Sequence, residues 1–423
     1  MTTSTDFAQH LRQAAPFVHA HKGKLCVAYV PGEAAQREDF TAHLFDLALA
    51  HGLGMQLILV LGARPQIEAR LLQAGIAEKL HRDLRITDAA TLQCVKDATG
   101  ALRNDVEAML STALARTPLG GRRIEVVSGN LVTARPTGIL DGVDMHYTGE
   151  LRRIAVASIR EHLAHERVVL LPCVGTSPTG ESFNLRSDDL AVAVAAAMQA
   201  DKLMLFSPRH IPPGECMPDD LARAELPDIE RSIALRAVSA GVSRVHLLPM
   251  DVPGVVLSEL YTHTGQGLMV SNAATDRIRP ATIEDIGGLL HLIAPLEANG
   301  TLVPRSREQL ELDIEHFAVM EHDGMIIGCR ALLPLEGGRD AELACVVVHP
   351  DWRGGRRAAT LVRHAEASAR NLGIERLFVL TTRTVHWFVE QGFAPCAPDL
   401  LPGLRKALYN WQRASQVLAK TLS

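Results

Sequence analysis

Short apolar runs alternate with amphipathic helical patterns along the first part of the chain. Runs of this length, bounded by charged or turn-forming residues, are typical of buried strands. Residues 39–51 and 188–200 instead repeat their apolar positions with a helical period. Regular alternation of the two predicts an α/β sandwich in which helices cover a mainly parallel sheet. The predicted strands are 25–30, 56–61, 124–127, 168–171, 203–206 and 245–248.

The periodic pattern breaks near residues 271–280, where small and polar residues dominate. Such stretches commonly connect domains. We therefore expect a first domain over 22–272, a linker over 273–279 and a second domain over 280–423. Residues 1–21 have the pattern of a separate amphipathic N-terminal helix.

The second domain has the pattern of an α+β unit that opens with a capped helix. Thr282 and Asp285 have the spacing of a capping-box pair at its start. The later elements are a hairpin near 322–324, a strand over 343–348, a turn over 353–358, a helix over 359–370, a strand over 377–380 and a helix through Trp387.

Composition excludes several classes of protein. The 423 residues exceed one core of roughly 250–300 residues, which supports two domains. A net charge of −5 gives no support for nucleic-acid binding. The seven cysteines have no paired spacing, which indicates free thiols in a reducing compartment and no metal site. Without a signal peptide or an apolar run of about 20 residues, we expect a cytoplasmic protein with no membrane partner.

The turn over 353–358 is the most informative chemical feature of the chain. It follows a valine-rich strand, contains Arg353, Arg356 and Arg357, and precedes a helix. Backbone N–H groups at a helix N-terminus attract phosphate, and arginine adds charge-assisted donors. The sequence therefore predicts a site for a ligand that carries a diphosphate.

From about residue 278 onward the chain resembles the GNAT family of acetyl-CoA-dependent N-acetyltransferases. The resemblance rests on 346–353, on the turn, and on 387–393 with its Gly-Phe pair; Arg356 stands where the family usually has glycine. It implies that acetyl-CoA is bound with its diphosphate on the turn and its pantetheine beside the strand. The implied cofactor residues are Val346, Val347, Val348, Arg353, Gly354, Gly355, Arg356, Arg357, Ala358 and Phe388.

The same resemblance implies the catalytic groups. A splayed strand would leave a free N–H near Cys345 or Val346 to polarise the thioester carbonyl. Glu342 is the candidate base, directly or through a water that Thr381 orients, although it can equally be a solvated strand-end carboxylate. The usual tyrosine acid is replaced by Phe388, which leaves the general acid open between His386 and solvent. Cys345 has no obvious histidine partner, so we expect direct attack without an acyl-enzyme.

Over nearly its whole length the chain resembles the bacterial N-acetylglutamate synthase family of arginine biosynthesis. The segments 305–311, 380–388 and 400–402 carry this resemblance. It implies L-glutamate as acceptor and N-acetyl-L-glutamate as product. From composition alone, the arginines assigned to this acceptor would be ordinary surface residues. The implied glutamate-binding residues are Val303, Arg305, Cys345, Arg413 and Ser415.

Residues 22–272 resemble the amino-acid kinase family, in particular its N-acetylglutamate kinase branch. The matching segments are 62–67, 127–130, 180–188 and 259–267. The segment 29–32 lacks the lysine and glycine pair of a working kinase, and bulky Arg64 occupies the phosphate turn. Phosphoryl transfer depends on such positioning and cationic groups, so we expect no kinase activity. The surviving Asn184 and Asp188 can equally be fold residues.

An inactive kinase domain can serve as a regulatory site or as an assembly scaffold. The resemblance implies L-arginine as effector, beside His246, Glu259, Gly265 and Gly267, and feedback inhibition as its effect. Glu259 alone would otherwise be a solvated helix residue. The N-terminal helix resembles the one through which arginine-sensitive relatives form hexamers, so we expect a homohexamer. The rival functions are a true kinase, an amino-acid sensor without transferase activity, and acetyl transfer to another amine.

Overall fold

The computed structural model describes residues 4–114, 123–221, 225–262, 265–271, 276–322, 324–354, 356–407 and 415–422. It divides into two compact units, Met1–Ala273 and Ala274–Ser423. Each unit has its own sheets and its own hydrophobic core. We therefore describe the two units separately.

The first unit is built on an eight-stranded sheet of order β14-β16-β15-β13-β1-β2-β10-β5. All neighbouring strands are parallel except β15 and β16, which confirms the predicted mainly parallel sheet. The predicted strand over 124–127 is shorter than expected, because only its last two residues form β5. The strands are β1 (Leu25–Val30), β2 (Gln56–Leu61), β5 (Val126–Val127), β10 (Val168–Pro172), β13 (Lys202–Ser207), β14 (Gly214–Cys216), β15 (Arg244–Pro249) and β16 (Leu268–Ser271).

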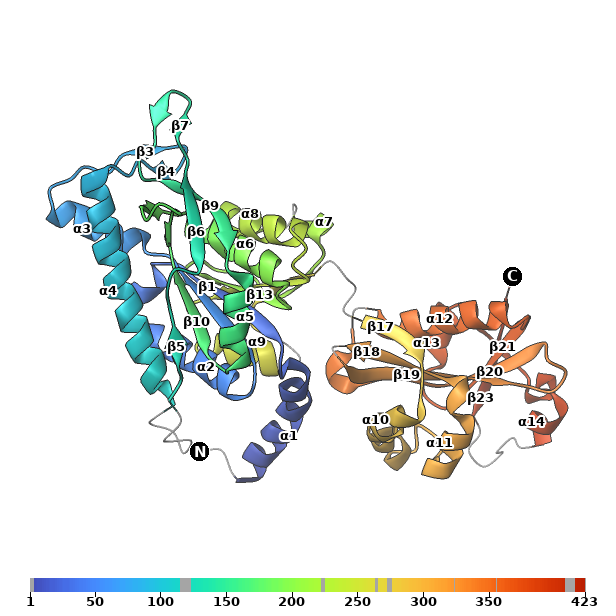
Figure 1. Ribbon diagram of the computed structural model, residues 1–423. Coiled ribbons are helices and arrows are strands. Elements are labelled where there is room, and N and C mark those ends of the chain that lie inside the picture. Colours follow the sequence, from blue (N-terminus) through green and yellow to red (C-terminus); the bar gives the residue numbers. More distant parts are fainter. Residues whose placement is uncertain are drawn as a thin grey trace. The chain divides into compact units, whose positions relative to one another are not determined.

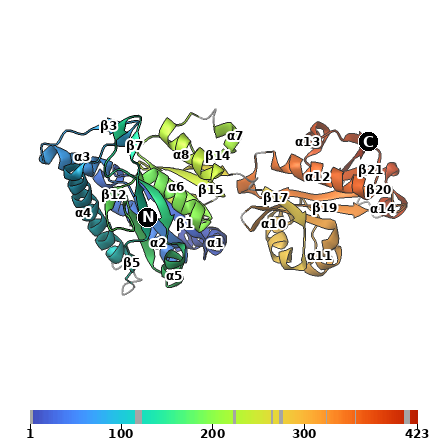
Figure 2. The same cartoon turned by 45° about the horizontal axis from the view of Figure 1, so that its top comes forward.

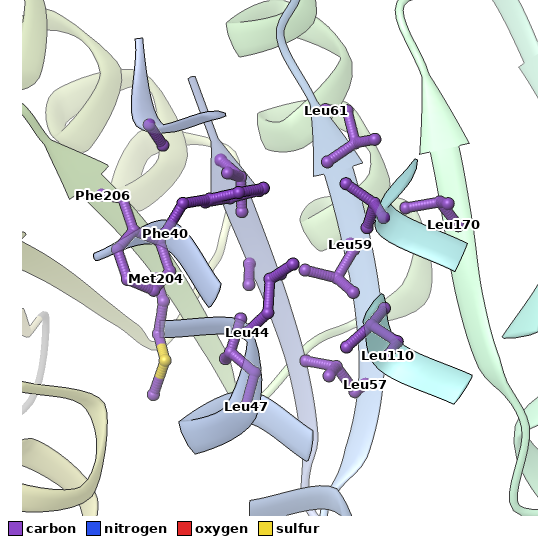
Figure 3. Packing of buried hydrophobic residues seen from close by; sticks show 14 of the residues in the cluster. Phe40, Leu44, Leu47, Leu57, Leu59, Leu61, Leu110, Leu170, Met204 and Phe206 are labelled. Atoms are coloured by element: carbon purple, nitrogen blue, oxygen red, sulfur yellow. The ribbon is translucent and has the colours of Figure 1, made fainter. Parts of the chain in front are cut away.

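Helices cover both faces of this sheet (Figure 1). Successive strand residues point to opposite faces, so Ala28 and Leu59 pack into one core while Val27 and Ile58 pack into the other. Burial on both faces explains why these strands are apolar throughout. Figure 3 shows the first core, where side chains of β2 meet those of neighbouring helices. The covering helices are α2 (Phe40–Gly52), α4 (Ala89–Ala113) and α9 (Val255–Tyr261) on that face, and α5 (Val156–Ala164), α6 (Ser187–Met198) and α8 (Asp228–Ser239) on the other.

Smaller elements complete the first unit. A four-stranded sheet has the order β12-β11-β6-β9, and β3–β4 and β7–β8 form short hairpins. Helix α1 spans the segment predicted as an N-terminal helix and contacts α9, where the His21 and Tyr261 rings lie 5.9 Å apart. The remaining bounds are α1 (Ser4–His21), α3 (Arg64–Gln73), β3 (Leu80–His81), β4 (Leu84–Arg85), β6 (Val132–Pro136), β7 (Ile139–Leu140), β8 (Val143–Asp144), β9 (Gly149–Ile154), β11 (Val174–Thr176), β12 (Ser182–Asn184) and α7 (Pro218–Leu221).

The second unit has a seven-stranded sheet of order β17-β18-β19-β20-β21-β23-β22. Its strands are antiparallel except for β20 and β21, which run parallel. Helices α12 and α13 lie on one face and α10 and α11 on the other (Figures 1 and 2). The bounds are β17 (Asp276–Pro280), α10 (Ile286–Ala298), α11 (Arg307–Asp313), β18 (Phe317–His322), β19 (Met325–Pro334), β20 (Asp340–Val348), α12 (Arg357–Asn371), β21 (Arg376–Thr381), α13 (Val385–Glu390), β22 (Ala394–Cys396), α14 (Gly403–Ala407) and β23 (Gln416–Thr421).

The predicted linker over 273–279 is wrong for its last four residues, because residues 276–279 belong to strand β17. This strand lies at the edge of the sheet and pairs only with β18 among the described strands. Edge strands carry charged side chains and lack the continuous apolar run of a central strand, so the segment has the composition of a linker. The predicted capping box of Thr282 and Asp285 is confirmed, ahead of α10.

None of the helices within the described ranges has the length and apolar character needed to cross a membrane.

Candidate active site

A cleft opens in the second unit where β20 ends and α12 begins. It is lined by backbone and side chains of the predicted phosphate turn, so this part of the sequence-based site is brought together. Gly355 lies outside the described residues. A concave surface with several arginines at a helix N-terminus is suited to a diphosphate. The lining residues are Val348, Arg353, Gly354, Arg356, Arg357, Ala358, Ala359, Arg363, Trp387 and Gln391.

The unusual Arg356 occupies the N-cap of α12 with a left-handed backbone, at φ = 59°. Glycine adopts such a conformation without steric cost, whereas a residue with a Cβ does not. This backbone conformation explains why the family usually has glycine at this position. In this chain Arg356 adopts it at a steric cost, and the residue lines the cleft.

Phe388, which the sequence predicted as a cofactor residue, lies instead in the hydrophobic core. It is 6% exposed and meets Phe393 edge-on, with ring centroids 5.6 Å apart. The cleft is lined by Trp387 and Gln391, which the prediction omitted. Trp387 lies on α13 and Gln391 is the C-cap of this helix, four residues later, so the two share a face, whereas Phe388 belongs to the next face. The helical period was the signal that could have identified them.

Strand β20 separates from β21 after its first residues. The two strands pair only from Asp340 to Glu342, and the later part of β20 has no partner on the β21 side among the described residues. On the other side the register with β19 shifts between Cys329 and Ala331. Cys345 has a left-handed backbone at φ = 51°, which reorients the peptide groups at this point. The geometry agrees with the splayed strand that the resemblance implied near Cys345 and Val346.

Glu342 is not the solvated strand-end carboxylate of the alternative interpretation, because it is only 7% exposed. It is also not free, since Arg405 of α14 donates Nε to Oε2 and Nη2 to Oε1, the latter at 3.2 Å. The hydrogen bond to Glu342 raises the pKa of Arg405. Any proton transfer by Glu342 must therefore take place beside the Arg405 guanidinium or after its displacement. No local sequence pattern predicted this partner.

Thr381 ends β21 and takes part in a local turn. Its hydroxyl lies 2.8 Å from the hydroxyl of Thr384 and accepts the backbone N–H of Thr384 at 3.1 Å. In the neighbouring strand Gln416 pairs with Thr381, which places buried Ser415 beside the same end of β21. A predicted catalytic residue at the end of β21 and a predicted substrate residue just before β23 therefore lie near each other.

Arg305 and Cys345, both predicted to contact the acceptor, meet although 40 positions separate them. Arg305 Nη1 donates to Cys345 Sγ at 3.1 Å, and the Arg305 backbone N–H donates to Glu297 at 2.9 Å. Burial raises the pKa of the Cys345 thiol, which keeps it protonated and disfavours a nucleophilic role. Val303 is exposed nearby in sequence, and Arg413 lies outside the described residues.

At the turn of the kinase-like unit the segments around Gly32 and Arg64 pack closely against each other. A Cβ on Gly32 would lie 2.7 Å from Pro65 Cδ, and Gln66 Nε2 donates to the Gly32 carbonyl at 2.7 Å. A cavity of about 320 Å³ opens at this turn, lined by Gly32, Gly62 and Arg64 as well as by Asn184 and Asp188. Asn184 donates to Thr87 at 3.1 Å and Asp188 accepts from Arg186 and Arg236. Both surviving polar residues are therefore engaged by the fold.

The four residues predicted to bind arginine come together in the first unit. His246 Nδ1 lies 2.7 Å from Glu259 Oε1, and the N–H groups of Gln266 and Gly267 donate to Oε2 at 3.0 and 2.9 Å. Gly265, at φ = 44°, brings this loop onto the carboxylate. Glu259 is therefore not a solvated helix residue, since its side chain is 5% exposed.

The electrostatics of this pair follow from its burial. Burial lowers the pKa of His246 and outweighs the opposing effect of its hydrogen bond to Glu259. For Glu259 burial alone would raise the pKa, but the contacts from His246 and from two backbone N–H groups bring it below its usual value. The arrangement holds a buried carboxylate in its ionised form beside a neutral imidazole.

No group of histidine, cysteine, aspartate or glutamate side chains that could hold a metal ion occurs among the residues that the structure describes. The strand, turn and helix of the second unit, taken together with the mainly parallel sheet of the first, define a class of protein. This class is an acetyl-CoA-dependent acetyltransferase joined to an amino-acid kinase fold.

Comparison with known proteins agrees with this class. Residues 26–208 match the amino acid kinase family and residues 289–393 the acetyltransferase (GNAT) family. The amino-acid acetyltransferase of Ectopseudomonas mendocina is 46% identical over 435 residues, which cover 99% of this chain and 100% of the relative. That of Pseudomonas aeruginosa is 45% identical over 434 residues with the same coverage. The chain therefore belongs to the amino-acid acetyltransferases, the bacterial N-acetylglutamate synthase family.

Two solved structures extend the likeness. N-acetylglutamate synthase from Neisseria gonorrhoeae, complexed with coenzyme A and L-arginine, has a TM-score of 0.84 and 32% identity over 98% of this chain and 99% of its own. The same enzyme complexed with coenzyme A and N-acetyl-glutamate has a TM-score of 0.60 and 33% identity over 99% of both chains. The chain is an amino-acid acetyltransferase whose co-substrate is acetyl-CoA.

Proposed function

We propose that the chain transfers the acetyl group of acetyl-CoA to the α-amino group of L-glutamate, as the first step of arginine biosynthesis. The observation that carries this proposal is the contact between Arg305 and Cys345, which puts a cation beside the splayed part of β20. A dicarboxylate acceptor needs cationic forks, and arginine suits bidentate carboxylate binding. The Neisseria relative complexed with N-acetyl-glutamate supports the same acceptor.

The proposed reaction is direct attack. The glutamate amine loses a proton to Glu342, directly or through a water that Thr381 orients, and its nitrogen forms a bond to the thioester carbon. Backbone N–H groups near Cys345 and Val346 stabilise the oxyanion. The C–S bond then breaks, and the CoA thiolate takes a proton from solvent or from His386. Cys345 forms no covalent intermediate, in keeping with its raised pKa.

The test is CoA release with a panel of amino acids, with the acetylated product identified by mass spectrometry. We expect turnover with L-glutamate and product of the mass of N-acetylglutamate. Turnover with another amine and none with glutamate would refute the acceptor assignment. ATP consumption with N-acetylglutamate would favour the kinase alternative; the lack of a lysine in the segment 29–32 argues against it.

We further propose that L-arginine is a feedback inhibitor bound at His246, Glu259, Gly265 and Gly267. A guanidinium has the charge and hydrogen-bond donors that an ionised buried carboxylate accepts. The Neisseria relative complexed with L-arginine supports this assignment. Glu259→Gln should abolish the arginine-induced thermal shift and inhibition, whereas Glu230→Gln, at another buried glutamate of this unit, should retain both. Inhibition retained in Glu259→Gln would contradict the site.

We also propose a cytoplasmic homohexamer assembled through α1. Leu11 on this helix is 57% exposed, which leaves an apolar group available for a neighbouring copy. Light scattering should give the mass of six chains, and Leu11→Glu should lower it. A full-length chain that remains a dimer or tetramer at all concentrations would refute the hexamer.

A further inference from the structure

Asp276, the first described residue of β17, connects the start of the second unit to the phosphate turn. Its Oδ2 accepts from Arg357 Nε at 2.6 Å, and its Oδ1 accepts from His322 Nδ1 at 2.9 Å. Arg357 is the first residue of α12 and lines the cleft. The carboxylate therefore bridges two residues that lie 46 and 81 positions farther along the chain.

The Trp352 ring packs against both His322 and Arg357. It lies 4.3 Å from the ring of His322, and the Arg357 guanidinium lies 5.3 Å from the indole centroid. Arg357 Nη1 also donates to the Trp352 carbonyl at 3.4 Å. Arg357 is thus held between a carboxylate and an aromatic face, with only 17% of its side chain exposed.

An arginine held in this way loses little conformational freedom when a ligand binds. Both arginine and lysine side chains have large rotamer entropy, and fixing them beforehand lowers the cost of binding. Asp276 accepts from Nε at 2.6 Å and from Nη2 at 3.5 Å, so it holds the guanidinium in one orientation at the start of α12, beside the cleft. The geometry and the burial together favour a positioning role over a surface ion pair.

We propose that Asp276 is a positioning residue for acetyl-CoA, which it serves by fixing Arg357 and the start of α12. Strand β17, the first strand of the second unit, then determines the affinity for acetyl-CoA through Asp276. This inference rests on the proposed placement of the CoA diphosphate at the turn 353–358.

The same strand supplies a matched control. Arg279, three residues along β17, is held by Asp285 through hydrogen bonds of 2.7 and 2.9 Å and by Glu321 at 2.7 Å. This network has the same chemistry, but it anchors the start of α10, and none of its residues is among the described residues that line the cleft. The Asp285 variant therefore shows the effect of losing an aspartate–arginine pair that involves β17. The Asp276 variant shows the effect of losing the pair that reaches the turn.

The experiment compares Asp276→Asn and Asp285→Asn in the full chain by calorimetric titration with CoA and by steady-state kinetics. We expect Asp276→Asn to raise the Kd for CoA and the KM for acetyl-CoA by about 5- to 30-fold, with kcat and the KM for glutamate within twofold of wild type. Asp285→Asn should lower the Tm and leave the CoA parameters unchanged. An unchanged Kd for CoA in Asp276→Asn, or an equal rise in Asp285→Asn, would overturn the inference.

Arg357→Lys is the second variant, because it keeps the cation and loses the Nε donor to Asp276. It should raise the Kd for CoA in the same direction, and the double variant should bind no more weakly than the weaker single one. Additive effects, or no effect of Arg357→Lys, would count against positioning. If wild type itself failed to bind CoA, the placement of the co-substrate would be wrong; CoA binding without turnover of glutamate would refute only the acceptor.

Discussion

Replacement of Glu342 by glutamine tests whether this carboxylate is the catalytic base or only the partner of Arg405. The substitution keeps the size and hydrogen-bonding capacity of the side chain and removes its charge and its ability to take a proton. The question arises because both oxygens of Glu342 accept from the Arg405 guanidinium. A base role and a purely structural role predict different consequences for rate and for stability.

The two magnitudes can be worked out from the contacts. Loss of a general base typically lowers the rate about 10²- to 10⁴-fold, which corresponds to about 3–5 kcal/mol on the barrier. Loss of the ion pair leaves Arg405, whose side chain is 26% exposed, without its anion. A partly buried charged group deprived of its partner costs about 1–3 kcal/mol of stability. We therefore expect kcat for Glu342→Gln to fall at least 100-fold while the chain remains folded.

Asp340 provides a control on the same strand. It lies two residues before Glu342, on the same face of β20, and is held by Arg376 through hydrogen bonds of 3.0 and 2.8 Å. Asp340→Asn removes an equivalent ion pair at the end of the strand that is farther from Cys345. It should lower the Tm by an amount similar to Glu342→Gln and leave kcat within about threefold.

The assay is kcat from CoA release with saturating glutamate and acetyl-CoA, together with the Tm of each variant. If Glu342→Gln retained kcat within threefold of wild type while losing stability as Asp340→Asn does, Glu342 would be a structural residue. In that case the proton would leave the amine by way of solvent, and the proposed base would have to be abandoned.

Three further predictions concern the turn, the core and the arginine site. Arg356→Gly should raise the Tm, measured by calorimetry, because glycine adopts the left-handed N-cap without strain, whereas Arg356→Ala should not. If the guanidinium binds a phosphate of CoA, both variants should raise the KM for acetyl-CoA equally in steady-state kinetics. Leu59→Ala, in the core of Figure 3, should cost about 2–5 kcal/mol in urea unfolding, and a loss below 1 kcal/mol would contradict the packing. The pKa of His246 in the folded chain lies below its ordinary 6.5, so the unfolded chain binds a proton at this imidazole first, and the free energy of unfolding should fall as the pH drops through 6.5. The pKa of Glu259 is also lowered, which adds a further loss of stability below about pH 4.5. Thermal melts from pH 8 to 5 should show a smaller loss in His246→Gln, and an equal loss would refute the assignment to this imidazole.

The sequence predicted central strands well and the edge strand badly, for one physical reason. Strands β1 and β2 bury both faces, so their residues must be apolar and the run is visible without any partner. Strand β17 pairs on one side and carries Asp276, Arg277 and Arg279, so its pattern matches that of a linker. Local periodicity therefore reports burial, and it fails where a strand stays in contact with water.

Site residues could be predicted where the local sequence itself determines the backbone conformation. The phosphate turn has a recognisable strand before it and a helix after it, and the anomaly at Arg356 coincides with a positive φ. Partners that fold in from elsewhere leave no such signal. Arg405 lies 63 positions from Glu342, and Asp276 lies 81 positions from Arg357, so no spacing within a helix or strand could have suggested either pair.

The two forked carboxylates of β20 show how the structure changes the catalytic question. Sequence singled out Glu342 by resemblance, yet Asp340 on the same strand is also held by an arginine fork. The difference lies in what holds each arginine. Arg376 belongs to β21, pairs directly across from Asp340 and lies 4.8 Å from the Phe378 ring centroid, so it is fixed by the sheet. Arg405 comes from α14, a five-residue helix outside the sheet, so strand pairing does not hold it in place. With the proposed dicarboxylate acceptor, Glu342 is the one of the two carboxylates that can be freed from its arginine, because that substrate offers Arg405 an alternative anion.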